Sequence, residues 1–368
     1  MSWTKEILLV NSKDFETQFQ HLIESAQFSI DLSTYIFSSD EFAQKILELL
    51  KAKAQHSIRV RLLVDGVGSL TTIKLLRQSC GELLQLKVYH PLPRIFYNFS
   101  LRNLFAFRNF FRLLYLSNRR NHQKLLLIDG KTALVGSHNI THESLEWRES
   151  SILVSGKHVK TICAIFEYAW RRPRLRDLNT ERATKAIRKD RYVLHNTTSP
   201  FRLRHNRTFY RRLQEAQKHI WITTPYFLPP PKILYLLMKK ARAGVDVRLL
   251  LPQVSDVRIS KWLAESFYNE LLKCGIRIYE YKKTILHAKG FILDDWATVG
   301  SSNLNYRSLF RDLELDIVLR DSSIISKLKQ QFLTDINCSN KIDPKKKARF
   351  SLLKFILVRA LSLFKGSM

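Results

Sequence analysis

The sequence predicts an α/β protein that contains two copies of one folding unit. Residues 22–64 and 213–251 both read as a helix, a strand that ends in a tyrosine, a second helix and a β-rich strand. The β-rich strands are "IRVRLLV" and "VDVRLLL", and a further helix and strand follow each of them, ending in "LKVYH" and "IRIYEY". Strands that alternate with helices favour sheets covered by helices on both faces.

Length and composition limit the class of protein. The chain has 368 residues, enough for two ordinary domains, and a net charge of +29. Such a charge indicates an anionic partner, either nucleic acid or a membrane surface rich in acidic lipid. The four cysteines lack zinc-ligand spacing, so we expect reduced thiols. Without a signal-peptide core or an apolar run of about 18 residues, a soluble or peripheral protein is expected.

A polar, strongly charged segment separates the two copies. "RRPRLRDLNTERATKAIRKDR", residues 171–191, is poor in aromatic residues and reads as a linker. We therefore expect a first half at 1–175, a basic linker at 176–194, a second half at 195–340 and a tail at 341–368.

The same string of polar residues ends each copy. "HQKLLLIDGKTALVGSHN" and "HAKGFILDDWATVGSSN" share a histidine, a lysine, an aspartate and a Gly-Ser-x-Asn sequence, and a glutamate follows each histidine by 27 residues. One H-x-K is a weak signal, because a lone histidine at a strand start is usually structural. Two matched copies indicate a functional site. Its candidate residues are His122, Lys124, Asp129, Ser137, Asn139, Glu149, His287, Lys289, Asp294, Ser301, Asn303 and Glu314.

These motifs carry a resemblance to the phospholipase D superfamily over nearly the whole chain. "TTPYFLPP", "GIRIYEY", "LHAKGFILDD" and "WATVGSSNLNYRS" look like the second half of bacterial cardiolipin synthases, and "RLLVDGVGS", "YHPLP" and "NHQKLLLIDG" look like the first. The resemblance implies two tandem phospholipase D-type α-β-α sandwich halves, related by pseudo-twofold symmetry and sharing one active site.

The chain departs from the family pattern at two places. Only five residues separate Asp294 from Gly300, against six between Asp129 and Gly136, so either Asp294 or Asp295 fits the motif position. In addition, Asn305 stands where many relatives have aspartate. We expect neither change to abolish activity.

The residue types fit exchange at a phosphodiester. One imidazole can attack phosphorus and form a phosphohistidine, while a second gives its proton to the leaving alcohol. The resemblance assigns His122 as the nucleophile and His287 as the acid and base, which the symmetric sequence leaves open. No metal or other cofactor is expected, because two lysines supply the positive charge. The other predicted roles are phosphate binding for Lys124, Lys289, Asn139 and Asn303, hydrogen bonding for Ser137 and Ser301, histidine orientation for Glu149 and Glu314, and turn stabilisation or catalysis for Asp129 and Asp294.

Two tyrosines end equivalent strands. Tyr35 and Tyr226 have either a packing role, which is usual for tyrosine at a strand end, or a place at the mouth of the site.

The segment before His122 bears on the choice between lipid and nucleic acid. Residues 83–128 contain no acid, and a predicted insertion at about 91–120 mixes arginine with phenylalanine and tyrosine. Tyr35 and His122 are 87 residues apart, whereas Tyr226 and His287 are 61 apart, so the second copy lacks this insertion. Its composition favours an interfacial membrane segment, with a nucleic-acid surface or a covering helix as alternatives.

The C-terminal tail is a second candidate for membrane contact. It opens with three lysines at 345–347 and continues with an apolar-rich run that Lys354 and Arg359 interrupt. That pattern suits a helix in the interface of an anionic leaflet, and a helix docked on the protein body is the alternative.

These features predict a peripheral phosphatidyltransferase of the cardiolipin synthase type on the cytoplasmic side of a bacterial cell membrane. Phosphatidylglycerol as donor and acceptor would give cardiolipin and glycerol, and one monomer would complete the site. The alternatives are a phospholipase D that uses water, a nuclease, and a non-catalytic membrane-binding scaffold. The acid-free aromatic insertion disfavours nucleic acid as the partner, and the intact motifs disfavour the scaffold.

Overall fold

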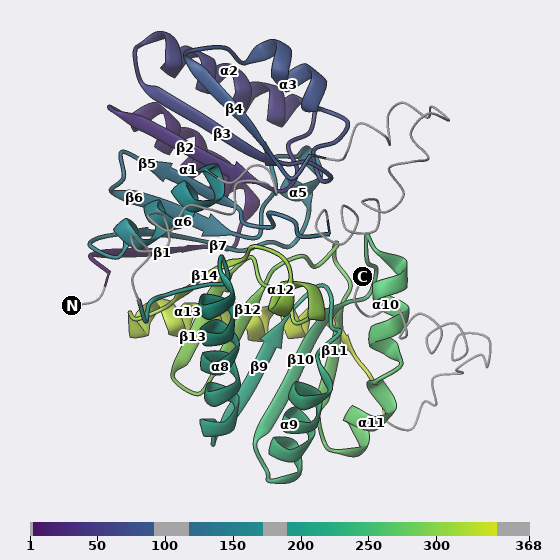
Figure 1. Cartoon of the computed structure of the whole chain (residues 1–368). Helices are drawn as coiled ribbons and strands as arrows, with labels where there is room; N and C mark the ends of the chain where they lie inside the picture. Colours follow the sequence, from purple (N-terminus) through teal and green to yellow (C-terminus); the bar gives the residue numbers. More distant parts are fainter. Residues whose placement is uncertain (1–2, 92–117, 172–189, 344–368) are drawn as a thin grey trace, which may run out of the picture.

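The first half of the chain forms a mixed seven-stranded sheet in a computed structural model that describes residues 3–91, 118–171 and 190–343 (Figure 1). Its strands are β1 (Lys5–Leu9), β2 (Ser29–Thr34), β3 (Arg59–Asp65), β4 (Leu84–Tyr89), β5 (Leu125–Ile128), β6 (Thr132–Gly136) and β7 (Ser151–Ser155). In space their order is β1-β7-β6-β5-β2-β3-β4. Strands β2, β3 and β4 are parallel, and β5 joins β2 in the antiparallel direction.

The second half repeats this sheet. Its strands are β8 (Val193–His195), β9 (His219–Thr223), β10 (Asp246–Pro252), β11 (Arg277–Tyr281), β12 (Gly290–Leu293), β13 (Trp296–Gly300), β14 (Leu315–Val318) and β15 (Ser339–Lys341). Their order is β15-β11-β10-β9-β12-β13-β14-β8, so β8–β14 take the places of β1–β7 and β15 is added. The predicted duplication of one α/β unit is confirmed.

Helices pack on the faces of both sheets, and most of them cover the outer faces. Those of the first half are α1 (Ser12–Ser25), α2 (Glu41–Gln55), α3 (Ile73–Ser79), α5 (His142–Glu146) and α6 (Val159–Arg171). Those of the second half are α8 (Ser199–Glu215), α9 (Pro231–Arg242), α10 (Arg258–Glu265), α11 (Tyr268–Lys273), α12 (Tyr306–Phe310) and α13 (Ser322–Asn337). The outer cores lie beneath α1 and α2 in one half and beneath α8 and α9 in the other.

A third core lies between the two sheets and joins the halves. It contains apolar residues of both motif strands, with α6 and α13 contributing along its edges. Strands β13 and β14 pack against β6 and β7. In β5, Leu125 and Leu127 face this central core, while Leu126 and Ile128 face the outer one. The uniformly apolar run after His122 is therefore explained by burial on both faces.

Several predicted segments fall outside the described residues. Residues 92–117, 172–189 and 344–368 contain most of the insertion, the linker and the tail. Strand β8 begins at Val193, two residues before the boundary expected at 195. Among the described helices, none combines the length and apolarity needed to cross a membrane.

Candidate active site

Each motif histidine lies where the two halves meet, just before a central strand. The N–H of His122 donates to the carbonyl of Leu313 at 3.0 Å, and the N–H of His287 donates to the carbonyl of Arg148 at 2.9 Å. Leu313 and Arg148 each directly precede the motif glutamate of their own half. The backbone of one half thus carries its glutamate to the histidine of the other.

The glutamates pair with the histidines reciprocally. Both carboxylate oxygens of Glu314 lie 3.0 Å from Nδ1 of His122, and Oε1 of Glu149 lies 2.5 Å from Nδ1 of His287. Both glutamates are buried. With Nδ1 engaged in each ring, Nε2 is the nitrogen left for chemistry. The sequence indicates that these glutamates face a histidine, and the structure adds that the partner is always in the opposite half.

The two lysines place buried positive charge beside the histidines. Nζ of Lys124 donates to the carbonyl of His122 at 2.9 Å, and Nζ of Lys289 donates to that of His287 at 2.6 Å. Nζ of Lys289 also lies 2.8 Å from Nε2 of His287. Burial lowers the pKa of Lys124 to about 7 and that of Lys289 to about 8. Desolvated cations in such a position attract an anion strongly.

The histidine–glutamate pairs differ in their electrostatics. Burial, together with Lys124 and Lys289, lowers the pKa of His122 well below its usual range, so its ring is uncharged at neutral pH. Burial also lowers the pKa of His287, although Glu149 opposes that shift. Burial raises the pKa of Glu314 to about 8. In Glu149 the effect of burial is outweighed by the charge and hydrogen bond of His287, which hold its pKa well below the usual range.

Two serine hydroxyls bind Glu314; burial raises the pKa of this carboxyl, and these two hydrogen bonds partly oppose that shift. Oγ of Ser301 donates to Oε2 of Glu314 at 2.5 Å, and Oγ of Ser308 donates to Oε1 at 2.6 Å. In the first half, Ser137 instead exchanges hydrogen bonds with the backbone of Ser150. Oε2 of Glu149 has no hydrogen-bond partner within the described part of the chain. The two halves therefore share residue types but not the same hydrogen bonds.

Ser308 is a site residue that the sequence interpretation missed. It follows Asn303 by five positions, and Ser144 follows Asn139 by five, so an N-x4-S spacing recurs in both copies. Ser144 donates to the backbone carbonyls of Asn139 and Thr141 and does not reach Glu149. The repeated spacing could have drawn attention to Ser308. It could not have predicted that Ser308, unlike Ser144, donates to the motif glutamate of its own half.

The motif asparagines lie in the buried wall of the site. Oδ1 of Asn139 accepts the N–H of Ile36 at 3.3 Å. Oδ1 of Asn303 is buried and lacks a hydrogen-bond partner among the residues that the structure describes. Asn305, the departure from the family pattern, caps α12 by accepting the N–H of Ser308 at 2.8 Å, a role that aspartate also fills.

The motif aspartates do not join the group around the histidines. The carboxylate of Asp129 accepts the N–H groups of residues 27–29 at 2.7–3.1 Å, and that of Asp294 accepts those of residues 217–219 at 2.7–2.9 Å. Each lies at the opposite end of its strand from the histidine. The side chain of Asp295 is 99% exposed, so Asp294 takes the motif position. These contacts favour the turn-stabilising interpretation over the catalytic one.

The motif glycines permit close approach of two strands. A Cβ atom on Gly136 would lie 2.5 Å from the carbonyl oxygen of Ser150, and one on Gly300 would overlap the backbone of Leu315 and Asp316. These contacts place the strand with the Gly-Ser-x-Asn sequence directly against the strand that follows the glutamate. The glycines thus bring Ser301 within reach of Glu314.

Aromatic and acidic side chains line the histidines. The ring of Tyr35 lies 5.3 Å from that of His122, and the ring of Tyr226 lies 6.1 Å from that of His287. Both tyrosines thus lie at the site rather than only in the core. The hydroxyl of Tyr226 donates to Asp256 at 2.5 Å. Asp256, which lies outside the repeated strings, was not predicted. Within the described ranges, no three His, Cys, Asp or Glu side chains are grouped to hold a metal ion.

Known proteins match both halves of this chain. A family model described as "Cardiolipin synthase, PLD-like domain" matches residues 19–170 and 209–336, one match in each half. "Cardiolipin synthase" of Halalkalibacterium halodurans is 31% identical over 92% of this chain and 67% of its own length. "Probable cardiolipin synthase YwiE" of Bacillus subtilis is 29% identical over 92% of this chain and 67% of its own length. The chain thus spans about two thirds of these relatives.

Solved structures share the fold over nearly the whole chain. A phosphatidylserine synthase of Haemophilus influenzae superposes with a TM-score of 0.71 at 16% identity, covering 99% of this chain and 95% of its own. A polyphosphate kinase of Porphyromonas gingivalis gives a TM-score of 0.59 at 12% identity, covering 98% and 56%. At these identities the likeness shows the fold alone. The family match in both halves goes further, and the chain belongs to the cardiolipin synthase family of phospholipase D-like enzymes.

Proposed function

We propose that the protein moves a phosphatidyl group from one phospholipid to the hydroxyl of another, with phosphatidylglycerol giving cardiolipin and glycerol. The observation that carries the proposal is the reciprocal pairing of His122 with Glu314 and of His287 with Glu149, next to two buried lysines. The names of the relatives supply the substrate class. The enzyme would act as a peripheral protein on the cytoplasmic face of a bacterial membrane, and one monomer would hold the complete site.

The first step is attack by His122 on phosphorus. An uncharged ring whose Nδ1 hydrogen points to Glu314 presents a lone pair on Nε2. The new P–N bond forms as the P–O bond to the glycerol head group breaks. The glycerol oxygen takes a proton from Nε2 of His287, and Glu149 stabilises the charge of that ring before transfer.

The second step reverses the first with a new alcohol. The hydroxyl of an incoming phosphatidylglycerol attacks the phosphorus of the phosphohistidine and gives its proton to His287. The P–N bond breaks, which releases cardiolipin and restores His122. Water in place of the alcohol would give phosphatidic acid, so transfer requires that lipid rather than water occupies the acceptor position.

The buried cations and amides supply phosphate binding. Lys124 and Lys289 would hold the non-bridging oxygens and offset the charge that develops on them in the transition state. Asn139 and Asn303 would add neutral donors. These amides are buried beside the histidines, so they can act without competition from water.

Product analysis tests the reaction. Purified protein is incubated with phosphatidylglycerol vesicles and the lipids are separated. Cardiolipin with an equal amount of glycerol is the expected result. Phosphatidic acid as the only product would show that the enzyme hydrolyses the lipid rather than transferring its phosphatidyl group. Cleavage of plasmid DNA without a lipid product would overturn the lipid assignment.

Trapping tests the assignment of the histidines. Protein mixed briefly with phosphatidylglycerol labelled at phosphorus and quenched in alkali should carry the label on His122. His287→Asn should still take up label, at a reduced rate, whereas His122→Asn should take up none. Label on His287 in the wild-type protein would reverse the two roles.

A further inference from the structure

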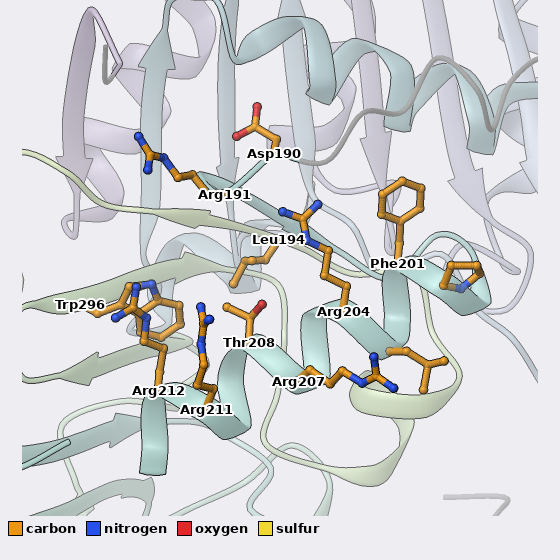
Figure 2. Close-up of a pocket in the computed structure, with 12 residues that line it drawn as sticks. Asp190, Arg191, Leu194, Phe201, Arg204, Arg207, Thr208, Arg211, Arg212 and Trp296 are labelled. Carbon is orange, nitrogen blue, oxygen red and sulfur yellow. The ribbon is translucent and has the colours of Figure 1, made fainter. Parts of the chain in front are cut away.

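A pocket of about 710 Å³ lies beside α8 in the second half and shares no residue with the candidate active site (Figure 2). Helix α8 supplies most of its wall, and the rest comes from β8, the two residues Asp190 and Arg191 that lie shortly before it, and the start of β13. It combines guanidinium groups with large apolar side chains. Its arginines include Arg204, Arg207 and Arg211, and its apolar residues include Leu203 and Trp296.

The arginines occupy one side of α8. Arg204, Arg207 and Arg211 are spaced three and four residues apart, which places them in a row along the helix, and Figure 2 shows them projecting from it. The opposite side of the helix, which includes Phe209 and Leu213, is buried in the outer core. A row of like charges at this spacing destabilises a helix unless an anion lies among them.

Acidic side chains do not neutralise this row. Asp190 is the one acid in the pocket lining, and its carboxylate is bound to His158 at 2.7 Å and to Thr161 at 3.0 Å. Glu215, at the end of α8, is within ion-pair distance of Arg211. Across the described part of the chain, Arg204 and Arg207 lie in no ion pair.

The first half provides an internal comparison. Helix α1 takes the place of α8 there, since each precedes the strand whose first N–H groups bind the motif aspartate. Its sequence, "SKDFETQFQHLIES", has no arginine and carries three acids. The fold itself therefore does not require a basic face on this helix.

Apolar groups complete the pocket. Leu203 is 56% exposed and is open to a ligand, whereas Trp296 is 8% exposed and belongs to the outer core. Trp296 pairs with Leu293 in the second sheet, and Thr132 holds the equivalent position in the first sheet, where it pairs with Ile128. The large ring is therefore specific to the second half. The guanidinium of Arg212 lies 6.0 Å from the centre of that ring. Cations at the rim and apolar groups below them match a molecule with an anionic head and a hydrocarbon tail.

We propose that the α8 pocket is a second, non-catalytic binding site for an anionic membrane phospholipid. The lipid phosphate lies among Arg204, Arg207 and Arg211, and the glycerol and upper acyl chain lie against Leu203 and Trp296. Nucleic acid fits less well, because it presents a continuous row of phosphates rather than one phosphate joined to an apolar chain. The site holds the enzyme on an anionic bilayer, and it does not depend on the reaction proposed above.

Vesicle binding tests the site. The full chain is sedimented with phosphatidylglycerol vesicles and, separately, with phosphatidylcholine vesicles. Arg204→Gln/Arg207→Gln/Arg211→Gln should weaken binding to the anionic vesicles by about a hundredfold. Leu203→Ser should weaken it less, while leaving the charge unchanged. Turnover of detergent-dispersed phosphatidylglycerol should stay the same in both variants. Midpoints of thermal unfolding close to the wild-type value show that both variants are folded.

A matched control removes the same charge elsewhere. Lys13→Gln/Lys74→Gln/Arg77→Gln alters three exposed cations of the first half and should leave vesicle binding close to the wild-type value. Equal losses in the two triple variants would reduce the effect to net charge and overturn the proposal. Unchanged vesicle binding in the triple arginine variant would also overturn the proposal. The same conclusion would follow if that variant lost affinity for duplex DNA but not for vesicles. A fall in detergent-phase turnover would make the pocket part of the catalytic site.

Discussion

Glu314 and Glu149 occupy equivalent positions, yet they differ in what binds them. Glu314 accepts from two serine hydroxyls besides His122, whereas His287 is the sole side-chain partner of Glu149 in the described structure. A nucleophile and an acid need different proton affinities, so this difference is what a division of labour between the histidines requires. It arises from Ser301 and Ser308, since their counterparts Ser137 and Ser144 bind the backbone instead.

Ser308→Ala tests whether that difference matters. Removing this hydroxyl leaves a buried carboxyl oxygen without its donor and costs about 2 kcal/mol, which corresponds to roughly a thirtyfold lower kcat for lipid transfer. The pH dependence of kcat should shift as well, because Glu314 loses a donor. Ser144→Ala is the matched control. Its kcat, calculated per folded molecule, should equal the wild-type value. Equal kcat values for the two variants would remove Ser308 from the site.

The buried lysines predict how activity depends on pH. Lys124 and Lys289 have pKa values lowered to about 7 and about 8, so both are charged in acid and lose charge as pH rises through that range. Affinity for an anionic phosphodiester is therefore highest below pH 7 and falls above it. We expect kcat/KM, measured from pH 6 to 9, to decline through 7 and 8.

Lys124→Arg provides the control for this pH profile. Arginine keeps its charge throughout the range, so the decline should move to higher pH even if the maximum activity is lower. A wild-type profile that stays level up to pH 9 would contradict a role for either lysine in binding the phosphate.

At the scale of single residues, the sequence was most informative where the copies agree. The pattern that begins at His122 and His287 picked out the histidines, lysines and glutamates that the structure brings together. It could not predict which glutamate pairs with which histidine, because pairing within a half and pairing between halves are equally consistent with a symmetric sequence. Asp256 could not be predicted either, since it reaches Tyr226 from a loop that has no repeated pattern.

The turns at the ends of β5 and β12 show one structural device used twice. Asp129 and Asp294 both have positive φ, 54° and 53°, and both accept three backbone N–H groups at the start of the neighbouring strand. These bonds hold the pKa of each carboxyl below its usual value, despite partial burial. The motif aspartate thus fixes the register of the strand that carries the histidine.

Asp294→Ala should therefore impair stability rather than chemistry. Loss of a charged acceptor, together with a left-handed backbone that alanine disfavours, costs about 3 kcal/mol in the free energy of unfolding, measured in urea. The kcat of the folded fraction should be unchanged. Because the folded-state pKa lies below the unfolded value of 3.8, the stabilisation is present above pH 3.8 and is lost as pH falls through the folded pKa.

The adjacent residue supplies the control for the turn. Asp295→Ala removes a carboxylate that is 99% exposed and should leave the free energy of unfolding unchanged. A large fall in kcat with normal stability in Asp294→Ala would restore a catalytic role to the motif aspartate.

Elements were predicted well where their pattern is strong. The paired strands "IRVRLLV" and "VDVRLLL" appear as β3 and β10, each parallel to the strand before it in the chain. Strand β8 was missed because three residues beside a charged segment carry too little periodicity to detect. Its position follows from pairing with β14, which is a long-range contact.

The two halves act as one molecule because buried polar contacts cross between them. Arg148 of the first half contacts Asp335 of α13 with Nε at 3.1 Å from both oxygens and a terminal nitrogen at 2.9 Å. Both residues are buried, and Arg148 also holds the backbone of His287. Interface stability and site geometry therefore depend on the same residue.

Asp335→Ala should weaken the interface and the site together. Leaving the guanidinium buried without its partner costs about 3–5 kcal/mol of stability, and kcat should fall because the backbone that holds His287 is displaced. Thermal unfolding and lipid turnover measure the two effects. The control is Asp295→Ala, which removes a carboxylate that is 99% exposed. Normal activity in a destabilised Asp335→Ala would show that the site does not depend on this interface contact.

Reciprocal pairing also has a consequence for how such a chain can arise. A single half holds a histidine and a glutamate that cannot serve each other, but two identical halves facing each other would complete two equivalent pairs. Joining them in one polypeptide removes the requirement for identity. A substitution such as tryptophan at 296, where the first half has Thr132, then alters one side only. Covalent linkage thus lets the surroundings of the two histidines differ within one polypeptide.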